Sequence, residues 1–286
     1  MTLAPMKVAR SEHAAVVLGD RLIVLGGLFS VNPFRTEGTP SVEEYDFGSD
    51  TWADLPPLPE ARHHGMAAVV DDRLFFFGGY RLHGFDEVPD SWELVGDRWE
   101  SRAPIPSPVG AGAAAVVDGM IYLVGGTPLG STYRYDPEAN TWEQLSSPRV
   151  LREHLAAVEY GGKVWAIGGR WNGLAFDSVG IYDPITDEWT DGPKMSLRRS
   201  GFGAAVVGDR VIVAGGETFE PLVALDSVEV YFPGTGAWSA STPLPVGLHG
   251  NPMAGFDGSA FMPGGSLRPA GVDNDPTLFS FQEPDG

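Results

Sequence analysis

Residues 121–142 read IYLVGGTPLGSTYRYDPEANTW, and this stretch decides the fold. A run of β-branched and aromatic residues ends in a Gly-Gly pair at 125–126, which predicts a buried strand. Tyr135 then stands seven residues before Trp142, and the Asp-Pro-Glu-Ala-Asn segment between them is rich in turn-forming residues. The stretch therefore predicts short strands separated by tight turns.

The same pattern recurs along the whole chain. Gly-Gly pairs stand at residues 26–27, 78–79, 125–126, 168–169, 215–216 and 264–265, in steps of 43 to 52 residues. Four repeats carry a Tyr and a Trp seven residues apart: Tyr45 and Trp52, Tyr135 and Trp142, Tyr182 and Trp189, and Tyr231 and Trp238. The second repeat departs from this, with Leu94 and Trp99. A period near 50 residues is typical of stacked repeat units.

The recurring glycine pair with its spaced Tyr and Trp resembles the Kelch repeat. The resemblance implies an all-β, six-bladed propeller with four antiparallel strands per blade, lettered a to d from the axis outward. Strand a would be the small-residue strand, b would end in Gly-Gly, c would carry the Tyr and d the Trp. We expect the blades at about 11–55, 63–102, 110–146, 153–193, 200–242 and 250–282 of a single domain.

The two ends of the chain predict how the ring closes. After the sixth Gly-Gly pair the chain supplies one further strand, at 278–282, and then stops without a Trp. Residues 2–6 match the segment that follows the Trp in other repeats, as at 54–58. We therefore expect the N-terminal segment to complete the sixth blade as its outermost strand, because closure removes exposed sheet edges.

Composition excludes several function classes. The chain of 286 residues has no cysteine, which excludes disulfides, thiolate metal sites and cysteine nucleophiles. Its net charge of −19 argues against binding to nucleic acid or to anionic membranes. No apolar run approaches the roughly 20 residues of a membrane helix. We expect a cytoplasmic monomer that needs no cofactor.

Histidines and arginines are concentrated in one set of loops. When the repeats are aligned on Gly-Gly, the loops between strands d and a fall at 10–13, 62–65, 109–112, 152–155, 199–202 and 248–251. All six histidines are predicted to lie on the face that these loops share with the b–c loops: His13, His63, His64, His83, His154 and His249. Because histidine titrates near neutral pH and loops on a rigid scaffold often carry function, this face is the predicted site. We call it the mouth.

The mouth arginines have two possible roles. An Arg opens the d–a loop in four blades, and a position that recurs with the repeat can serve the repeat by bonding backbone carbonyls. The alternative is ligand binding. The predicted ligand-binding residues are Arg10, Arg62, His63, Arg81, Arg152, Arg170, Trp171, Asn172, Arg199, Ser200, His249 and Arg268.

Three functions remain open. The first is binding of an anionic small molecule or an acidic peptide, because arginine forks suit carboxylates; BTB-Kelch adaptors bind acidic peptides on this face, and Arg62, Arg152, Arg170, Arg199 and Ser200 stand at comparable positions. The second is a small-molecule enzyme of isomerase or lyase type with Glu217, His154 and His64 as acid–base residues. Glu217 resembles the acidic residue of bacterial sialic-acid mutarotases, although Val223 replaces that family's Arg. The third is a metal site built from His13, His64, His154 and Glu12.

Overall fold

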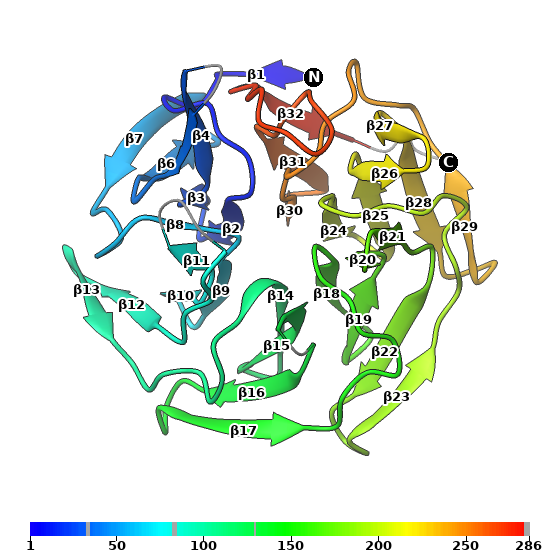
Figure 1. Cartoon of the computed structure of the whole chain (residues 1–286), viewed down its shortest axis with the longest axis horizontal. Coiled ribbons are helices and arrows are strands. Elements are labelled where there is room, and N and C mark those ends of the chain that lie inside the picture. The colour runs from blue at the N-terminus through cyan, green and yellow to red at the C-terminus, as the bar shows by residue number, and fades with distance from the viewer. Residues whose placement is uncertain (33–34, 82–84, 129, 283–286) are drawn as a thin grey trace.

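The computed structural model describes residues 1–32, 35–81, 85–128 and 130–282. Six four-stranded antiparallel sheets surround a central axis like the blades of a propeller (Figure 1). The part of the chain that is described contains no helix that could span a bilayer. Every blade is wound the same way, with its first strand at the axis, except that the sixth takes its outermost strand from the N-terminus.

The strands follow the repeat. From the axis outward, the blades are β2 (Ala14–Leu18), β3 (Arg21–Leu25), β6 (Val42–Asp46), β7 (Thr51–Leu55); β9 (Met66–Val70), β10 (Arg73–Phe77), β12 (Ser91–Val95), β13 (Arg98–Ser101); β14 (Gly110–Val117), β15 (Met120–Thr127), β16 (Thr132–Asp136), β17 (Thr141–Leu145); β18 (Ala156–Tyr160), β19 (Lys163–Ile167), β22 (Val179–Asp183), β23 (Glu188–Asp191); β24 (Gly203–Val207), β25 (Arg210–Ala214), β28 (Val228–Phe232), β29 (Ala237–Ala240); and β30 (Ala254–Phe256), β31 (Ser259–Pro263), β32 (Leu278–Phe281), β1 (Thr2–Leu3).

Short two-stranded ribbons lie in the loops that form the mouth. They pair β4 (Leu28–Asn32) with β5 (Arg35–Gly38), β8 (Arg62–His63) with β11 (Tyr80–Arg81), β20 (Arg170–Trp171) with β21 (Leu174–Ala175), and β26 (Glu217–Phe219) with β27 (Leu222–Ala224). Three of them are hairpins within b–c loops, whereas β8 belongs to a d–a loop and β11 to a b–c loop. The ribbons hold the mouth loops to defined positions.

The N-terminal strand closes the ring, as the sequence predicted. Thr2 of β1 pairs with Phe279 of β32, and Leu3 pairs with Leu278. Just beyond β1, the Met6 amide donates to the Pro276 carbonyl at 2.8 Å, and the Met6 side chain is buried. Figure 1 shows the N-terminal strand lying against the red C-terminal blade. The last blade is therefore completed by the start of the chain.

The hydrophobic core lies between the blades. Successive side chains of a strand point to opposite faces of a sheet. Phe75 and Phe77 of β10 therefore pack against the third blade, while Leu74 and Phe76 pack against the first. Each of the six blade interfaces holds one such apolar cluster among the described residues. This is why the inner strands read as continuous apolar runs.

The repeat tryptophans join neighbouring blades. Trp142 pairs with Tyr135 across β16 and β17, and its indole N–H donates to the Ala103 carbonyl of the preceding blade at 2.7 Å. The equivalent bonds run from Trp52 to Ala4, Trp99 to Pro56, Trp189 to Ser146 and Trp238 to Pro193. The bond to Ala4 shows that the N-terminal segment occupies the place of a repeat's outer strand.

The glycine pairs have a steric cause. Both residues of every pair have positive φ. A Cβ at Gly78 would lie 2.3 Å from the carbonyl oxygen of Val109 in the next blade, so only glycine fits. The second glycine of each pair donates its N–H to the carbonyl that opens the next d–a loop, as Gly79 does to Val109 at 2.8 Å. These bonds run around all six interfaces and close on the first blade through Gly265 and Arg10.

Candidate functional site

A closed ring of backbone hydrogen bonds frames the mouth. The third residue of each d–a loop donates its N–H to the carbonyl of the same position in a neighbouring blade, over 2.7–3.0 Å. The six residues are Glu12, His64, Ala111, His154, Gly201 and Gly250, and all have φ between 51° and 61°. This left-handed conformation suits glycine and costs other residues about 1–3 kcal/mol. Two of the six positions are glycine and one is alanine, whereas the other three carry an ionisable side chain in this strained conformation.

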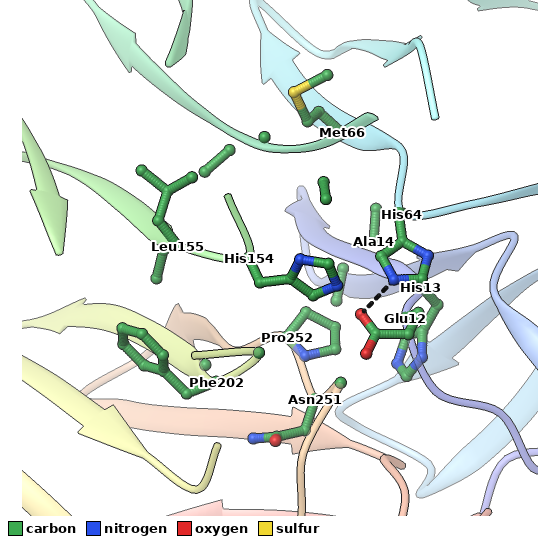
Figure 2. A pocket seen from close by; sticks show the side chains of 18 of the residues that line it. Glu12, His13, Ala14, His64, Met66, His154, Leu155, Phe202, Asn251 and Pro252 are labelled. Carbon is green, nitrogen blue, oxygen red and sulfur yellow. Dashed lines mark ion pairs between the residues drawn. The ribbon is translucent and has the colours of Figure 1, made fainter. Parts of the chain in front are cut away.

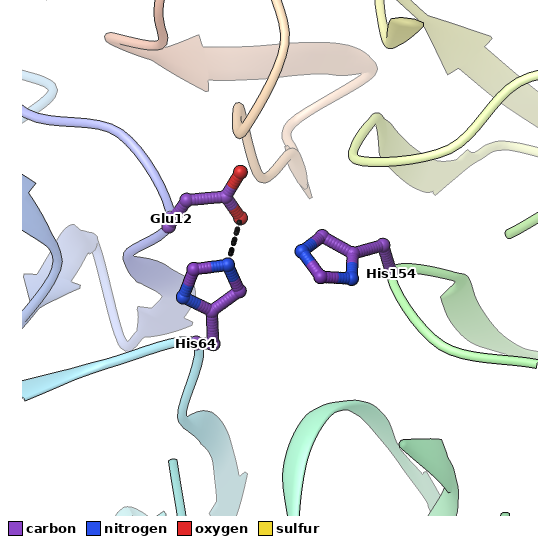
Figure 3. Close-up of side chains that lie close together, drawn as sticks. All are labelled: Glu12, His64 and His154. Carbon is purple, nitrogen blue, oxygen red and sulfur yellow. Dashed lines mark ion pairs between the residues drawn. The ribbon is translucent and has the colours of Figure 1, made fainter. Parts of the chain in front are cut away.

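These three ionisable side chains meet over the axis. His64 Nε2 lies 3.3 Å from Glu12 Oε2, and the His64 and His154 rings are 4.7 Å apart between centroids. One potential ligand atom from each of Glu12, His64 and His154 lies within 4.8 Å of the other two. Figures 2 and 3 show the three side chains pointing toward one another from different blades. Below them is a narrow axial cavity of about 160 Å³, lined by the small residues of the inner strands.

A second group of charged side chains adjoins this cluster. Arg170 donates through Nε to Glu153 Oε1 at 2.7 Å and through Nη1 to Glu217 Oε1 at 2.5 Å. Its Nη2 lies 3.2 Å from His154 Nε2. The Glu217 carboxylate also accepts the Ala270 amide at 2.7 Å. Arg170 and Glu217 each follow a Gly-Gly pair directly, so the repeat itself brings them to adjacent places.

Two carboxylates of the mouth, Glu12 and Glu153, have lowered pKa values. Burial opposes ionisation of Glu12, but the nearby His64 and His154 outweigh it and lower its pKa to about 2. Burial likewise opposes ionisation of Glu153, whose bonds to His154 and Arg170 lower its pKa to about 2. Burial lowers the pKa of His64 well below 6.5, and the nearby Glu12 carboxylate opposes this shift. The Arg170 guanidinium bonds two of the mouth carboxylates, those of Glu153 and Glu217.

His249 completes the inner wall. Its side chain is almost fully buried, and Nε2 lies 3.9 Å from both Glu12 Oε1 and Glu217 Oε2. Nδ1 is buried and makes no hydrogen bond to any described residue. The His249 imidazole thus faces the cluster without a hydrogen bond to any described residue of it.

A larger hollow opens beside the cluster. It measures about 410 Å³ and lies between the mouth loops of the second, third and fourth blades. Its lining combines aromatic rings with carboxylates and polar groups: Tyr80, Phe85, Glu87, Thr127, Glu153, Trp171, Asn172 and Gly173. Glu153 belongs both to this hollow and to the charged group around Arg170.

The four recurrent arginines are not at the surface, which corrects their assignment to ligand binding. Arg10, Arg62, Arg152 and Arg199 are at most 2% exposed. Arg152 donates to the Gly168 and Ser178 carbonyls of its own blade, at 2.8 and 2.9 Å. Arg10 pairs with buried Glu43 and Arg199 with buried Glu229, while Arg62 bonds Asp90 at 2.6 Å. These side chains have no exposed donor surface for a ligand. Arg10, Arg152 and Arg199 join the d–a loop to the end of strand b and the start of strand c, whereas Arg62 bonds the segment before strand c.

The other predicted residues divide between mouth and periphery. Trp171 and Asn172 line the hollow, and buried His63 lies with its Nδ1 2.6 Å from that of His64. Ser200 is fully buried below the mouth. Arg81 and Arg268 are exposed at the rim. His83 lies outside the described residues.

His13 does not join the predicted metal set. Its Nε2 lies 2.9 Å from the Pro263 carbonyl, and burial lowers its pKa to about 3. Because His13 follows the left-handed residue, its side chain points into the blade interface instead of across the mouth. The structure therefore retains only Glu12, His64 and His154 of that set.

The sequence analysis missed Tyr80, and it placed Glu153 in the mouth loop 152–155 without assigning it a role. Glu153 faces Arg170 across an antiparallel bridge, and Tyr80 occupies in the second blade the place that Arg170 and Glu217 occupy in theirs. The signal that could have identified the role of these residues is the position directly after Gly-Gly. In every repeat this position lies beside the second residue of the d–a loop. Aligning that position across the repeats identifies both residues.

Comparison with known proteins agrees with this architecture. Residues 12–216 match the KLHDC2/KLHL20/DRC7 Kelch-repeats domain, and residues 198–245 match the Kelch motif. Kelch-like protein terF of Aspergillus terreus is 28% identical over 310 aligned residues, covering 99% of this chain and 67% of terF. Human Kelch-like protein 15 is 27% identical, over 83% of this chain and 35% of its own length. The chain thus spans only about a third of that protein.

A solved structure shares the fold. The structure of YjhT superposes with a TM-score of 0.82, covering 97% of this chain and 95% of YjhT, at 18% sequence identity. That likeness concerns the arrangement of the six blades. The sequence match covers well over half of the chain, and the glycine pairs and tryptophans that define the repeat have the structural roles described above. This chain belongs to the Kelch-repeat family.

Proposed function

We propose that this protein binds a small polar molecule, neutral or cationic, in the hollow beside the mouth cluster. The observation that carries the proposal is the lining of that hollow. Three aromatic side chains, Tyr80, Phe85 and Trp171, share it with Glu87 and Glu153. Its volume of about 410 Å³ lies within the range of small-molecule sites.

The charges of the lining favour this class of ligand. Aromatic faces carry partial negative charge and attract cations, and they also stack on the C–H faces of neutral rings. Both carboxylates add negative charge. The anion expected from the arginine count has less support, because four arginines are buried and Arg170 is already paired with Glu153 and Glu217.

An acidic peptide fits the mouth less well than a small molecule. Binding an extended acidic segment requires several free cationic side chains spread over a broad surface. The exposed arginines of the described mouth are Arg35, Arg81, Arg198 and Arg268. Three of them already face a carboxylate: Arg35 pairs with Glu37, Arg81 lies 3.5 Å from Glu60, and Arg198 lies 4.0 Å from Asp177. The carboxylates of the central group would repel such a peptide.

The test is a binding screen by thermal shift and calorimetry. The probes are choline, glucosamine, a neutral disaccharide, sialic acid and a polyglutamate peptide. We expect choline, glucosamine and the disaccharide to bind. Trp171→Ala should weaken their binding about fivefold, since one cation–π or stacking contact is worth about 1 kcal/mol. Leu174→Ala is the matched control, because Leu174 is exposed on the same ribbon but does not line the hollow. Selective binding of polyglutamate, unaffected by Trp171→Ala, would overturn the proposal.

A second candidate is acid–base catalysis at the same mouth. The Glu153 carboxylate lies 2.6 Å from His154 Nδ1, and this orients the ring so that Nε2 faces the mouth. A carboxylate–imidazole pair of this kind supplies a general base. The test follows anomer exchange of sialic acid by proton NMR. Catalysis that Glu217→Gln and His154→Asn both reduce supports this candidate, and the spontaneous rate in the wild type excludes it for that substrate.

A further inference from the structure

We propose that Glu12, His64 and His154 together bind one divalent transition-metal ion at the centre of the mouth. The proposal does not depend on the small-molecule site described above. It rests on where the backbone aims these side chains, on what bonds their outer atoms make, and on the buried imidazole beside them.

The backbone ring aims the three side chains at one point. Their left-handed conformation and the ring of inter-blade hydrogen bonds turn each side chain over the axis. Ligand atoms bound to an ion at about 2.1 Å stand about 3.4 Å apart in tetrahedral geometry. The present separations of up to 4.8 Å require only small side-chain rotations to reach that spacing.

The other three positions of this ring supply no ligand atom from a side chain. The remaining left-handed positions are Ala111, Gly201 and Gly250, whose side chains are too short to reach the axis. An ion held by two imidazoles and a carboxylate would therefore keep coordination positions for water or a ligand. Structural metal sites are closed by protein ligands, whereas sites with open positions serve binding or catalysis.

Each imidazole has a partner on the nitrogen that faces away from the centre. His154 Nδ1 lies 2.6 Å from Glu153 Oε2, and His64 Nδ1 lies 2.6 Å from His63 Nδ1. Such outer partners fix ring orientation and raise the basicity of the ligating nitrogen in metal sites. Figure 3 shows a ring nitrogen of each histidine directed toward the Glu12 carboxylate.

His249 is an independent observation that points to a ligand at this place. Its side chain is 5% exposed, its Nδ1 has no hydrogen-bond partner among the described residues, and its Nε2 stands 3.9 Å from Glu12. The contact between Glu12 and His64 does not account for this second buried imidazole, which lies 3.9 Å from both Glu12 and Glu217 without a hydrogen bond to either. An ion bound at Glu12 accounts for the place of His249, because the imidazole then faces the open side of the ion's coordination shell.

The ligand set selects the class of metal. Two imidazoles and one carboxylate suit Zn²⁺, Fe²⁺, Co²⁺ or Ni²⁺ better than the all-oxygen ions Mg²⁺ and Ca²⁺. The Arg170 guanidinium near His154 Nε2 must move aside for that nitrogen to ligate. Its bonds to Glu153 and Glu217 are made by Nε and Nη1, so the contact that has to be given up is that of Nη2 with His154.

The experiment titrates chelator-treated full chain with Co²⁺ and with Zn²⁺. Visible absorption reports Co²⁺ bound by nitrogen ligands, and calorimetry gives the stoichiometry and affinity for Zn²⁺. We expect one ion per chain. Glu12→Gln, His64→Gly and His154→Gly should each weaken binding at least 100-fold, and the glycine variants should fold because glycine suits the left-handed position. Glu87→Gln, which changes another mouth carboxylate, should bind as the wild type does.

The result that overturns the proposal is a wild type whose Co²⁺ spectrum stays that of the free aqua ion, or binding that Glu12→Gln and Glu87→Gln weaken equally. The wild-type spectrum decides the matter even if a glycine variant fails to fold. Trp171→Ala separates the two proposals, because it should weaken small-molecule binding about fivefold while leaving Co²⁺ binding intact.

Discussion

Replacing Arg199 by alanine tests whether the recurrent arginines belong to the fold or to the mouth. The Arg199 side chain is fully buried. It donates to the Gly215 carbonyl at 2.7 Å, to the Ser227 carbonyl and hydroxyl at 3.0 Å each, and to Glu229 Oε1 at 2.8 Å. Arg199→Ala removes all four bonds at once.

The cost is dominated by Glu229. Its carboxylate is buried as well, and without Arg199 it retains only the Ser196 and Leu197 amides as described partners. Removing one partner of a buried ion pair costs about 3–5 kcal/mol, because the other charge stays in a poorly solvating environment. For a domain of this size each kcal/mol lowers the melting temperature by about 2–3 °C. We therefore expect a fall of about 6–15 °C.

The assay is thermal unfolding followed by circular dichroism, with Arg198→Ala as the matched control. Arg198 is the preceding residue, but its side chain is 69% exposed and stands 4.0 Å from Asp177. An exposed pair of this kind contributes little, so the control should melt within about 2 °C of the wild type. The double variant Arg199→Met, Glu229→Gln should recover part of the loss, since it leaves no unpaired buried charge.

The opposite pattern would refute the assignment. Suppose that Arg199→Ala melts like the wild type but no longer binds the ligand that the wild type binds. Arg199 would then contact the ligand at the mouth, and its buried conformation would not be the one that serves binding. Equal destabilisation by Arg198→Ala would also refute it, because the effect would then not come from the buried pair.

Two further perturbations test closure and alkaline stability. Deleting residues 1–8 removes the β1 pairing and the buried Met6, so we expect a loss of about 3–6 kcal/mol in unfolding experiments, and an unchanged melting curve would contradict ring closure. Burial raises the pKa of Tyr135 to about 12, and its hydroxyl donates to Asn140 at 2.7 Å. Its stabilising effect is complete below the unfolded pKa of about 10 and is lost as pH rises toward 12. The stability difference between wild type and Tyr135→Phe should therefore shrink between pH 10 and 12 in urea titrations; a constant difference would count against this.

Much of the fold could be predicted because its markers are local. A glycine pair is needed wherever the next blade's backbone comes within 2.3 Å of a Cβ position, as at Gly78, and a Trp is needed wherever an outer strand must bond the preceding blade. Both requirements recur once per blade, so their spacing reveals the number of blades. The mismatch at the chain ends then predicts which strand completes the ring.

The site could be predicted only in part. The mouth face and the residues Glu12, His64 and His154 follow from aligning the d–a loops. The alignment does not show whether a loop side chain enters the mouth or the blade, because residues two positions apart in one loop take opposite directions. Arg62 is buried within its blade while His64 points over the axis, and the left-handed φ of 54° at His64 makes the difference.

By itself the sequence determined the all-β class, the six repeats, the closure by the N-terminal strand and the face that carries the histidines. Each of these depends on residue types recurring at a regular interval. Only the tertiary structure decided that the arginine count overstates the positive charge of the mouth, and that Glu12, His64 and His154 converge above a narrow axial cavity. Convergence depends on the angle at which three separate blades meet the axis, and no single stretch of chain encodes that angle.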